Sequence, residues 1–230
     1  MHISLWGLAE QSKALRGADV VDKAVKNYAG DKRAIFVFTI NGINVDTIPD
    51  VAEFCAGAGV PLTFNHFTTT TTYETWIAQE KTDSLYFRLG DKGTDMALTP
   101  AALARSKQLI TAAMDAFPET VVYSQAFNDL IHDPAGLYEI DPESGLARDC
   151  GSRVTAHYRH FHSDLTDAGD VKCCAPNLSC ATCRAYMQSL STVLHRIPQF
   201  AARPDGLASW VELWDFWCRL NIVDWDRAPA

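Results

Sequence analysis

Four of the seven cysteines in this chain fall within one short stretch, CCAPNLSCATC, which ends at Cys183. Cys180 and Cys183 form a C-x-x-C pair, and this spacing lets two thiolates reach one metal centre from a single turn. Cys173 or Cys174 lies shortly before that pair, and Cys150 lies earlier still. Together these residues can supply four thiolates to one site.

A four-thiolate site suits two kinds of centre. Zinc takes four thiolates in tetrahedral structural sites, and a [4Fe–4S] cluster also takes four, one for each iron. The spacing leaves both open, as it leaves open the choice between Cys173 and Cys174. Three cysteines with one histidine also bind zinc, and three histidines lie in this region, with a solvated loop as their alternative role: His157, His160 and His162. We choose Cys174 over Cys173 as the upstream ligand, so the predicted ligands are Cys150, Cys174, Cys180 and Cys183.

Composition and charge narrow the class of protein. The net charge of −8 disfavours a nucleic-acid binder, which needs a basic surface. No window of about 18 apolar residues is present, so we expect no membrane span. The N-terminus, MHISLWGLAEQSK, lacks the basic and apolar regions of a signal peptide. We therefore expect a cytoplasmic protein, and in that reducing compartment clustered cysteines favour metal ligands or redox groups over structural disulfides.

Strand and helix patterns alternate over the first third of the chain. Residues 34–40, AIFVFTI, carry no charge and are typical of a strand buried on both faces of a parallel sheet. Apolar runs at 2–7 and 60–67 predict two further strands. Helices are expected over 19–28 and 48–57, and this alternation predicts an α/β fold built from parallel βα units.

The middle of the chain has fewer signals. The run TTTTT at 68–72 favours a loop or a strand exit. Thr99 and Pro100 are typical of a helix start, and that helix is expected to end at Phe117. TVVYS at 120–124 predicts one more strand, and a short helix is expected directly after it.

The last third changes character. A helix is expected over 183–197, with Pro198 ending it, and a second helix over the aromatic C-terminus, where we expect packing on the protein's own core. We place the βα units in residues 1–132. Residues 133–230 form a cysteine-rich extension of helices and loops.

Two stretches resemble radical SAM enzymes. A strand ending in Ser-x-x-Gly leads to Arg-Gly, a helix, a strand ending in Thr-Ile-Asn and an Asn-x-x-x-Ile turn, which is similar to the second half of a radical SAM βα barrel. The tail CAPNLSCATCR resembles SPASM-like extensions, which carry auxiliary iron–sulfur clusters. The matching barrel positions are Ser4, Gly7, Arg16, Gly17, Thr39, Ile40, Asn41, Asn44, Ile48, Gly59 and Val60.

The resemblance implies roles for three residues. Ser4 and Asn41 would lie near the ribose or methionine part of S-adenosylmethionine, and Arg16 would bind its carboxylate. Ordinary turn chemistry is the alternative for Ser4 and Asn41, and a surface position is the alternative for Arg16.

The sequence also departs from the family pattern, and this difference leads to further predictions. No three cysteines have the C-x-x-x-C-x-x-C spacing of the catalytic cluster, and the chain starts at what would be about the fourth barrel strand. We therefore expect a partial barrel that needs an N-terminal half, either a partner chain or a missing segment. Only then would it use S-adenosylmethionine on its unidentified substrate, so the chain alone is expected to be inactive. The alternative is a zinc-knuckle structural or adaptor protein without catalysis.

Overall fold

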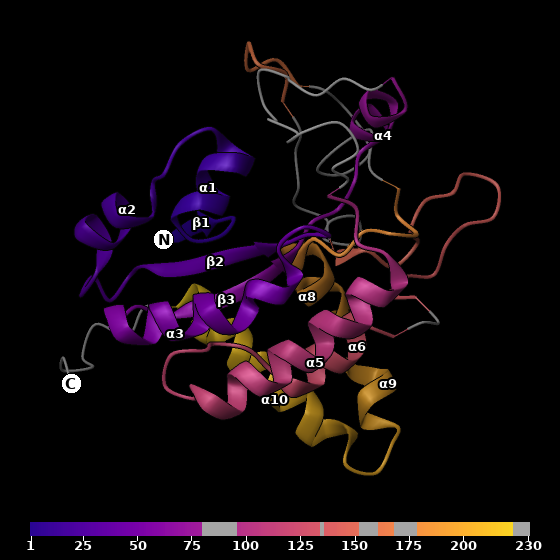
Figure 1. The fold of residues 1–230 in the computed structure, drawn as a ribbon. Coiled ribbons are helices and arrows are strands. Elements are labelled where there is room, and N and C mark those ends of the chain that lie inside the picture. The colour runs from indigo at the N-terminus through magenta and orange to yellow at the C-terminus, as the bar shows by residue number, and fades with distance from the viewer. Residues whose placement is uncertain (80–95, 134–135, 152–160, 168–178, 223–230) are drawn as a thin grey trace.

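The computed structural model describes residues 1–79, 96–133, 136–151, 161–167 and 179–222 (Figure 1). In chain order its elements are β1 (His2–Leu5), α1 (Ala9–Arg16), α2 (Val21–Tyr28), β2 (Ile35–Ile40), the 3-10 turn η1 (Val45–Thr47), α3 (Ile48–Ala58), β3 (Leu62–His66), α4 (Thr71–Ala78), α5 (Pro100–Ala116), α6 (Gln125–Ile131), α8 (Tyr186–His195), α9 (Ile197–Ala201) and α10 (Gly206–Asn221).

A parallel sheet with the strand order β1-β2-β3 forms the centre of the fold. Each strand pairs with the one before it in the chain, and helices connect them, which confirms the predicted α/β class. Val121 forms one parallel bridge to Leu62, so the winding continues in the same direction. The strand predicted at 120–124 is wrong in its length, because residues 120–124 form only this one bridge. Within the described residues the sheet is open and no barrel is shown.

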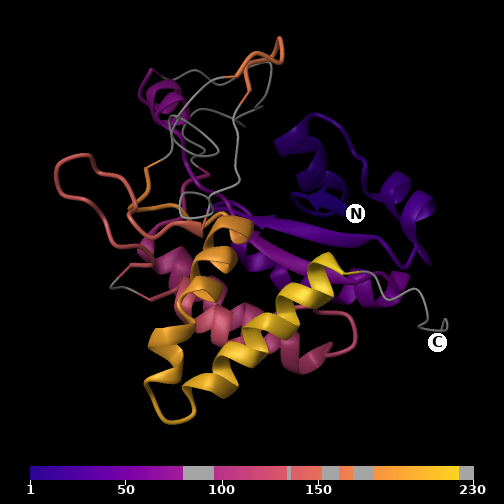
Figure 2. The same ribbon diagram turned by 180° about the vertical axis from the view of Figure 1, so that it is seen from behind.

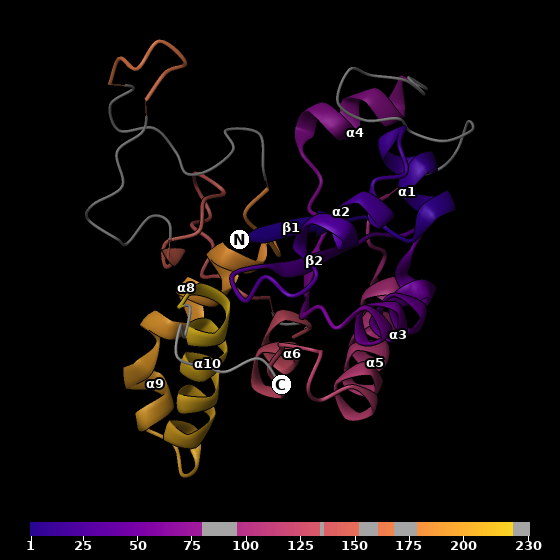
Figure 3. The same ribbon diagram turned by 90° about the vertical axis from the view of Figure 1, so that its left-hand side faces the viewer.

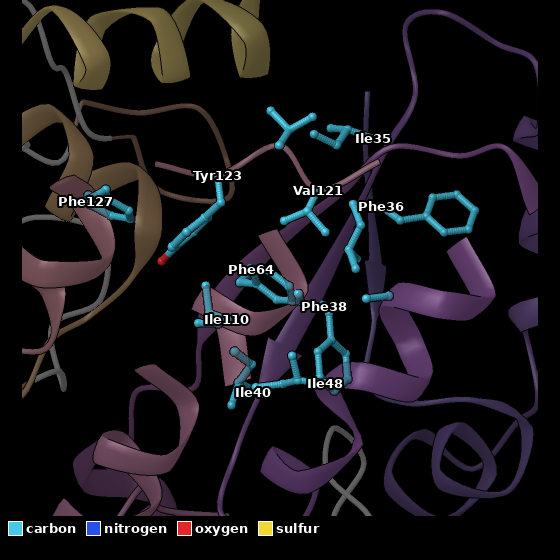
Figure 4. Close-up of a cluster of buried hydrophobic side chains, with 14 of the residues drawn as sticks. Ile35, Phe36, Phe38, Ile40, Ile48, Phe64, Ile110, Val121, Tyr123 and Phe127 are labelled. Carbon is cyan, nitrogen blue, oxygen red and sulfur yellow. The ribbon is translucent and has the colours of Figure 1, made fainter. Parts of the chain in front are cut away.

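β2 is buried along its whole length. All six of its residues are buried, as the uncharged run predicted, because β2 lies between two strands and is covered on both faces. Phe36 and Phe38 pack with Phe64, Ile48 and Ile110 in the cluster of Figure 4. These contacts place α3 and α5 on one face of the sheet.

The C-terminal helices lie on the other side of the sheet. His2 pairs with Ile35, and Asn65 pairs with Thr39, so alternation along β2 puts His2 and Asn65 on one face. That face meets α8 and α10, which cross the sheet when the molecule is viewed from behind (Figure 2) and form a separate layer in Figure 3. The main core also combines residues from both sides of residue 132, for example Val193 with Phe38.

Capping residues mark where several of the helices begin and end. Thr99 caps α5, its hydroxyl oxygen accepting a hydrogen bond from the Ala102 amide, and Gly59 ends α3 with a φ of 65°, a value that favours glycine. The threonine run was predicted as a loop, but Thr70 caps a helix there, α4. The helix predicted over 183–197 is α8, which is shorter at both ends, and α9 follows it as a separate helix.

Contacts between distant parts of the chain close the fold. The His2 ring makes a hydrogen bond through Nε2 to the Leu220 carbonyl at 3.1 Å, and its Nδ1 meets the Tyr186 hydroxyl. These bonds tie β1 to α8 and to the end of α10. Among the described residues, no helix has the length and apolar character that a bilayer span requires.

Candidate functional site

Three of the four predicted ligands lie together. Cys150 and Cys180 belong to one small hydrophobic cluster with Ala147, and both thiols are buried. Cys183 is also buried, and its sulfur accepts a hydrogen bond from the Tyr138 hydroxyl at 3.9 Å. Tyr138 itself packs on the cluster that holds the other two cysteines. The chain therefore gathers thiols that lie up to 33 positions apart in sequence.

The environment of Cys183 bears on its chemistry. Burial raises the pKa of this thiol above its ordinary value, and hydrogen bonds from the Ala185 amide and the Tyr138 hydroxyl oppose that shift. The charges of Cys150 and Cys180 raise the pKa of Cys183 further, so the three groups are close enough to interact electrostatically. A positive ion among them would reverse this repulsion.

The fourth predicted ligand and most of its alternatives lie outside the residues that the structure describes. Cys174 and its alternative Cys173 lie outside the described residues, as do His157 and His160, and His162 is exposed. Within the part of the chain that the structure describes, no group of three or more His, Cys, Asp or Glu side chains is arranged to hold a metal ion. The fit to a metal centre is therefore one of donor chemistry alone, since three buried thiols lie in one region.

The cysteine segment is fastened to the carboxyl end of β3. The Arg184 amide donates to the Thr68 hydroxyl at 3.1 Å, and the Tyr186 amide donates to Asn65 Oδ1 at 3.2 Å. Because these bonds flank Ala185, the chain is held there just after Cys183. The carboxyl ends of parallel strands are where α/β proteins usually bind their ligands.

Ser4 and Arg16 meet at the carboxyl end of β1. Arg16 Nη1 donates to the Ser4 carbonyl at 3.2 Å, and its guanidinium lies 6.0 Å from the centre of the Trp6 ring. Both predicted residues have exposed side chains. The guanidinium keeps further donors with which it could bind a carboxylate.

Asn41 lies on the neighbouring strand end and is fully buried. Its Oδ1 accepts hydrogen bonds from the amides of Ile43 and Asn44, which fixes the turn after β2. Its Nδ2 has no hydrogen-bond partner among the described residues. A buried amide donor without a partner costs about 1–3 kcal/mol, so this atom is a candidate contact for a ligand.

Asn44 joins two strand ends, a role that the sequence did not reveal. Its Nδ2 donates to the carbonyls of Trp6 at 3.0 Å and Thr39 at 2.9 Å. Its Oδ1 accepts from the Asn41 amide at 2.7 Å. This one buried side chain therefore sets the spacing between the carboxyl ends of β1 and β2.

A second cluster of buried polar side chains lies at the carboxyl end of β3. His66 Nε2 is 3.1 Å from His132 Nε2, and Ser106 Oγ is 2.8 Å from the same His132 atom. Burial is the main reason that the pKa of His66 falls well below its ordinary value and that of His132 falls to about 4. Both rings are therefore neutral at pH 7, and His66 and Ser106 are almost wholly buried. The position of His66 at a strand end was the only sequence signal.

No family model, curated protein or solved structure matches this chain.

Proposed function

We propose that this chain is the C-terminal half of a radical SAM iron–sulfur enzyme that acts on an unidentified substrate. It would carry half of the βα barrel and an auxiliary [4Fe–4S] site on Cys150, Cys174, Cys180 and Cys183. The observation that carries the proposal is the gathering of three buried thiols in a segment fastened to the carboxyl end of β3. The family resemblance of the sequence motifs supplies the identity of the cofactor.

The winding of the sheet supports a half-barrel. Consecutive parallel strands lie side by side in chain order, and the Leu62–Val121 bridge adds a fourth position in the same direction. This strand order is the one found in a βα barrel, whereas a doubly wound sheet reverses its direction. The edge of β1 away from β2 carries no strand among the described residues, so it is where an N-terminal half would join.

The chain's own residues would define the auxiliary site. When bound, a [4Fe–4S] cluster supplies one-electron chemistry. The thiols of Cys150, Cys180 and Cys183 would hold it, with the fourth thiolate from Cys174 or Cys173. The Tyr138 hydroxyl donates to the Cys183 sulfur, and hydrogen bonds to sulfur are one means by which proteins adjust cluster potentials. The apolar cluster around Cys150 and Cys180 limits the access of water.

The strand ends would form this half's share of the cofactor site. The unpartnered Asn41 Nδ2 provides a hydrogen-bond donor, and Arg16 beside Ser4 provides a cation for the carboxylate of S-adenosylmethionine. These contacts require the N-terminal half, because the three-cysteine motif of the catalytic cluster is absent from this sequence.

Metal analysis tests the auxiliary site. Protein purified without oxygen should be brown and should contain iron and acid-labile sulfide, and the Cys180→Ala variant should lose both. Cys218→Ala is the matched control, since Cys218 lies on α10 outside the cluster and should leave the metal in place. Colourless wild-type protein with stoichiometric zinc would refute the iron–sulfur assignment and support the zinc-knuckle adaptor.

A further inference from the structure

His66 and His132 form a buried pair that joins the carboxyl end of β3 to the end of α6. Their Nε2 atoms lie 3.1 Å apart, and the two rings meet edge to face with their centres 4.8 Å apart. His132 Nδ1 lies 2.7 Å from the Asn128 carbonyl, and Ser106 Oγ lies 2.8 Å from His132 Nε2. Groups from β3, α5 and α6 therefore meet at this pair.

The hydrogen-bond partners of the pair suit neutral rings. A charged imidazole donates from both of its nitrogens. His66 Nδ1 is buried and has no hydrogen-bond partner among the described residues, so a charged His66 ring would leave one N–H group without an acceptor. If both rings were charged, two N–H groups would also face each other between the Nε2 atoms. The geometry of the closed pair therefore opposes protonation.

The charges around the pair also oppose a further positive charge. Burial is the largest cause of the lowered pKa of both rings, and the charge of Arg184 lowers both further. From α5, Lys107 lowers the pKa of His132, whereas Asp129 of α6 raises it but forms an ion pair with Lys107 at 2.8 Å. Asp133, which follows the pair in the chain, is exposed, and β3 contains no charged residue.

Arg184 connects the pair to a third part of the chain. Its Nε donates to the carbonyl of Ile131, the residue before His132, at 3.1 Å. Its main-chain amide donates to the hydroxyl of Thr68, two residues after His66, also at 3.1 Å. The segment at Arg184 is therefore bound to the chain beside each ring, and movement of α6 away from β3 would break these bonds.

We propose that the His66–His132 pair is an acid-sensitive latch, which holds the end of α6 and the segment at Arg184 against the carboxyl end of β3 and releases them in acid. The latch needs no metal ion and is separate from the proposed enzyme role. The pKa of each ring is lowered in the closed form, so the closed form is fully stabilised above pH 6.5 and loses stability as pH falls towards 4.

Hydrogen exchange measured by NMR on the full chain tests the latch. The reporters are the amides of Arg184 and of the last turn of α6, with rates corrected for the intrinsic effect of pH. A pKa of about 4 for His132 when closed, against 6.5 when open, should raise the opened population about 20-fold between pH 7 and pH 5, and His66 adds to this rise. An unchanged population would overturn the latch.

Low concentrations of urea distinguish the latch from global unfolding. A local opening exposes little surface, so exchange of the reporter amides should change little with urea, whereas amides in the middle of α3 should exchange faster as urea is added. Reporter amides that follow the amides of α3 in urea would show that acid unfolds the whole protein and that no separate latch exists.

Two further measurements assign the opening to the rings. In the wild type, ¹⁵N shifts of both imidazoles should show neutral rings for as long as the Arg184 amide is protected, and a charged ring in that closed form would overturn the proposal. A His66→Gln/His132→Gln variant that folds, as verified by thermal unfolding, should lose most of the 20-fold rise. His162→Gln, at an exposed position, is the matched control and should keep it. A full rise in the folded double variant would also overturn the proposal.

Discussion

The Nε2 atoms of His66 and His132 lie 3.1 Å apart, and this contact joins the end of β3 to the end of α6. His132 Nδ1 is 2.7 Å from the Asn128 carbonyl, which can only accept, so this nitrogen carries the hydrogen. His132 Nε2 is then an acceptor, and His66 Nε2 donates to it. The pair therefore fits two neutral rings, and a proton added to His132 at Nε2 removes the acceptor of this bond.

Stability should fall in mild acid because of this pair. The pKa of both histidines is lowered in the folded protein, so the unfolded chain binds more protons below pH 6.5. The stabilisation is complete above that pH and is lost as pH falls towards 4. A pKa of about 4 for His132 corresponds to a loss of roughly 2 kcal/mol at pH 5, and His66 adds to it. Urea unfolding at pH 7 and pH 5 measures the change.

Substitution of both histidines gives the matching control. A His66→Gln/His132→Gln double variant should lose most of the difference between pH 7 and pH 5, whereas His162→Gln, at an exposed position, should keep it. An equal pH dependence in the double variant and the wild type would assign the effect to other groups.

Asn44→Ala should destabilise the protein strongly. The change removes hydrogen bonds to the carbonyls of Trp6 and Thr39 and to the Asn41 amide. Leaving buried backbone groups unpaired should lower the free energy of unfolding by about 2–4 kcal/mol. Asn221→Ala, which removes an exposed hydrogen bond to the Trp217 carbonyl, should change it by less than about 0.5 kcal/mol. Equal effects of the two variants would contradict the role of Asn44.

The chain alone should not cleave S-adenosylmethionine. A cluster held by four thiolates has no open iron for the cofactor, and the three-cysteine motif that leaves one iron open is absent. Reconstituted protein with dithionite should yield no 5′-deoxyadenosine above a no-protein control, as measured by chromatography. Production that is lost in Cys180→Ala would mean that the tail cluster is the catalytic one.

The edge of β1 that pairs with no described strand should be needed for completion of the proposed barrel. Co-expression with an N-terminal half should restore turnover, and Ile3→Lys should prevent that rescue, because a lysine on an edge strand opposes pairing with another strand. The same variant should retain the metal, since the cysteine segment is attached at β3. Loss of both rescue and metal would indicate general unfolding.

The sequence allowed prediction of the elements whose signals are local. An uncharged run predicted β2, and Thr99 with Pro100 predicted the start of α5, since buried strands and capped helices depend on neighbouring residues. Pro198 was interpreted as a helix end, but proline is also tolerated in a first turn and here opens α9. The bond between His66 and His132 could not be predicted, because it joins residues that lie far apart in the chain and have no shared motif.

For the candidate site, local spacing identified the C-x-x-C pair but not its surroundings. Cys150 and Cys180 share one small apolar cluster, while the ligand set and the identity of the metal both stay predictions. The anchoring of Arg184 to Ile131 depends on the packing of α6 against the sheet, which no spacing rule encodes.

The bonds of His2 to Tyr186 and Leu220 also bear on how the protein is made. β1 leaves the ribosome before the partners of His2, which follow it by 184 residues at Tyr186 and by 218 residues at Leu220. Until then the face of the sheet that carries His2 lacks its covering helices. Such long-range closure slows folding and leaves apolar surface open to misassociation, so the nascent chain is a candidate client for chaperones.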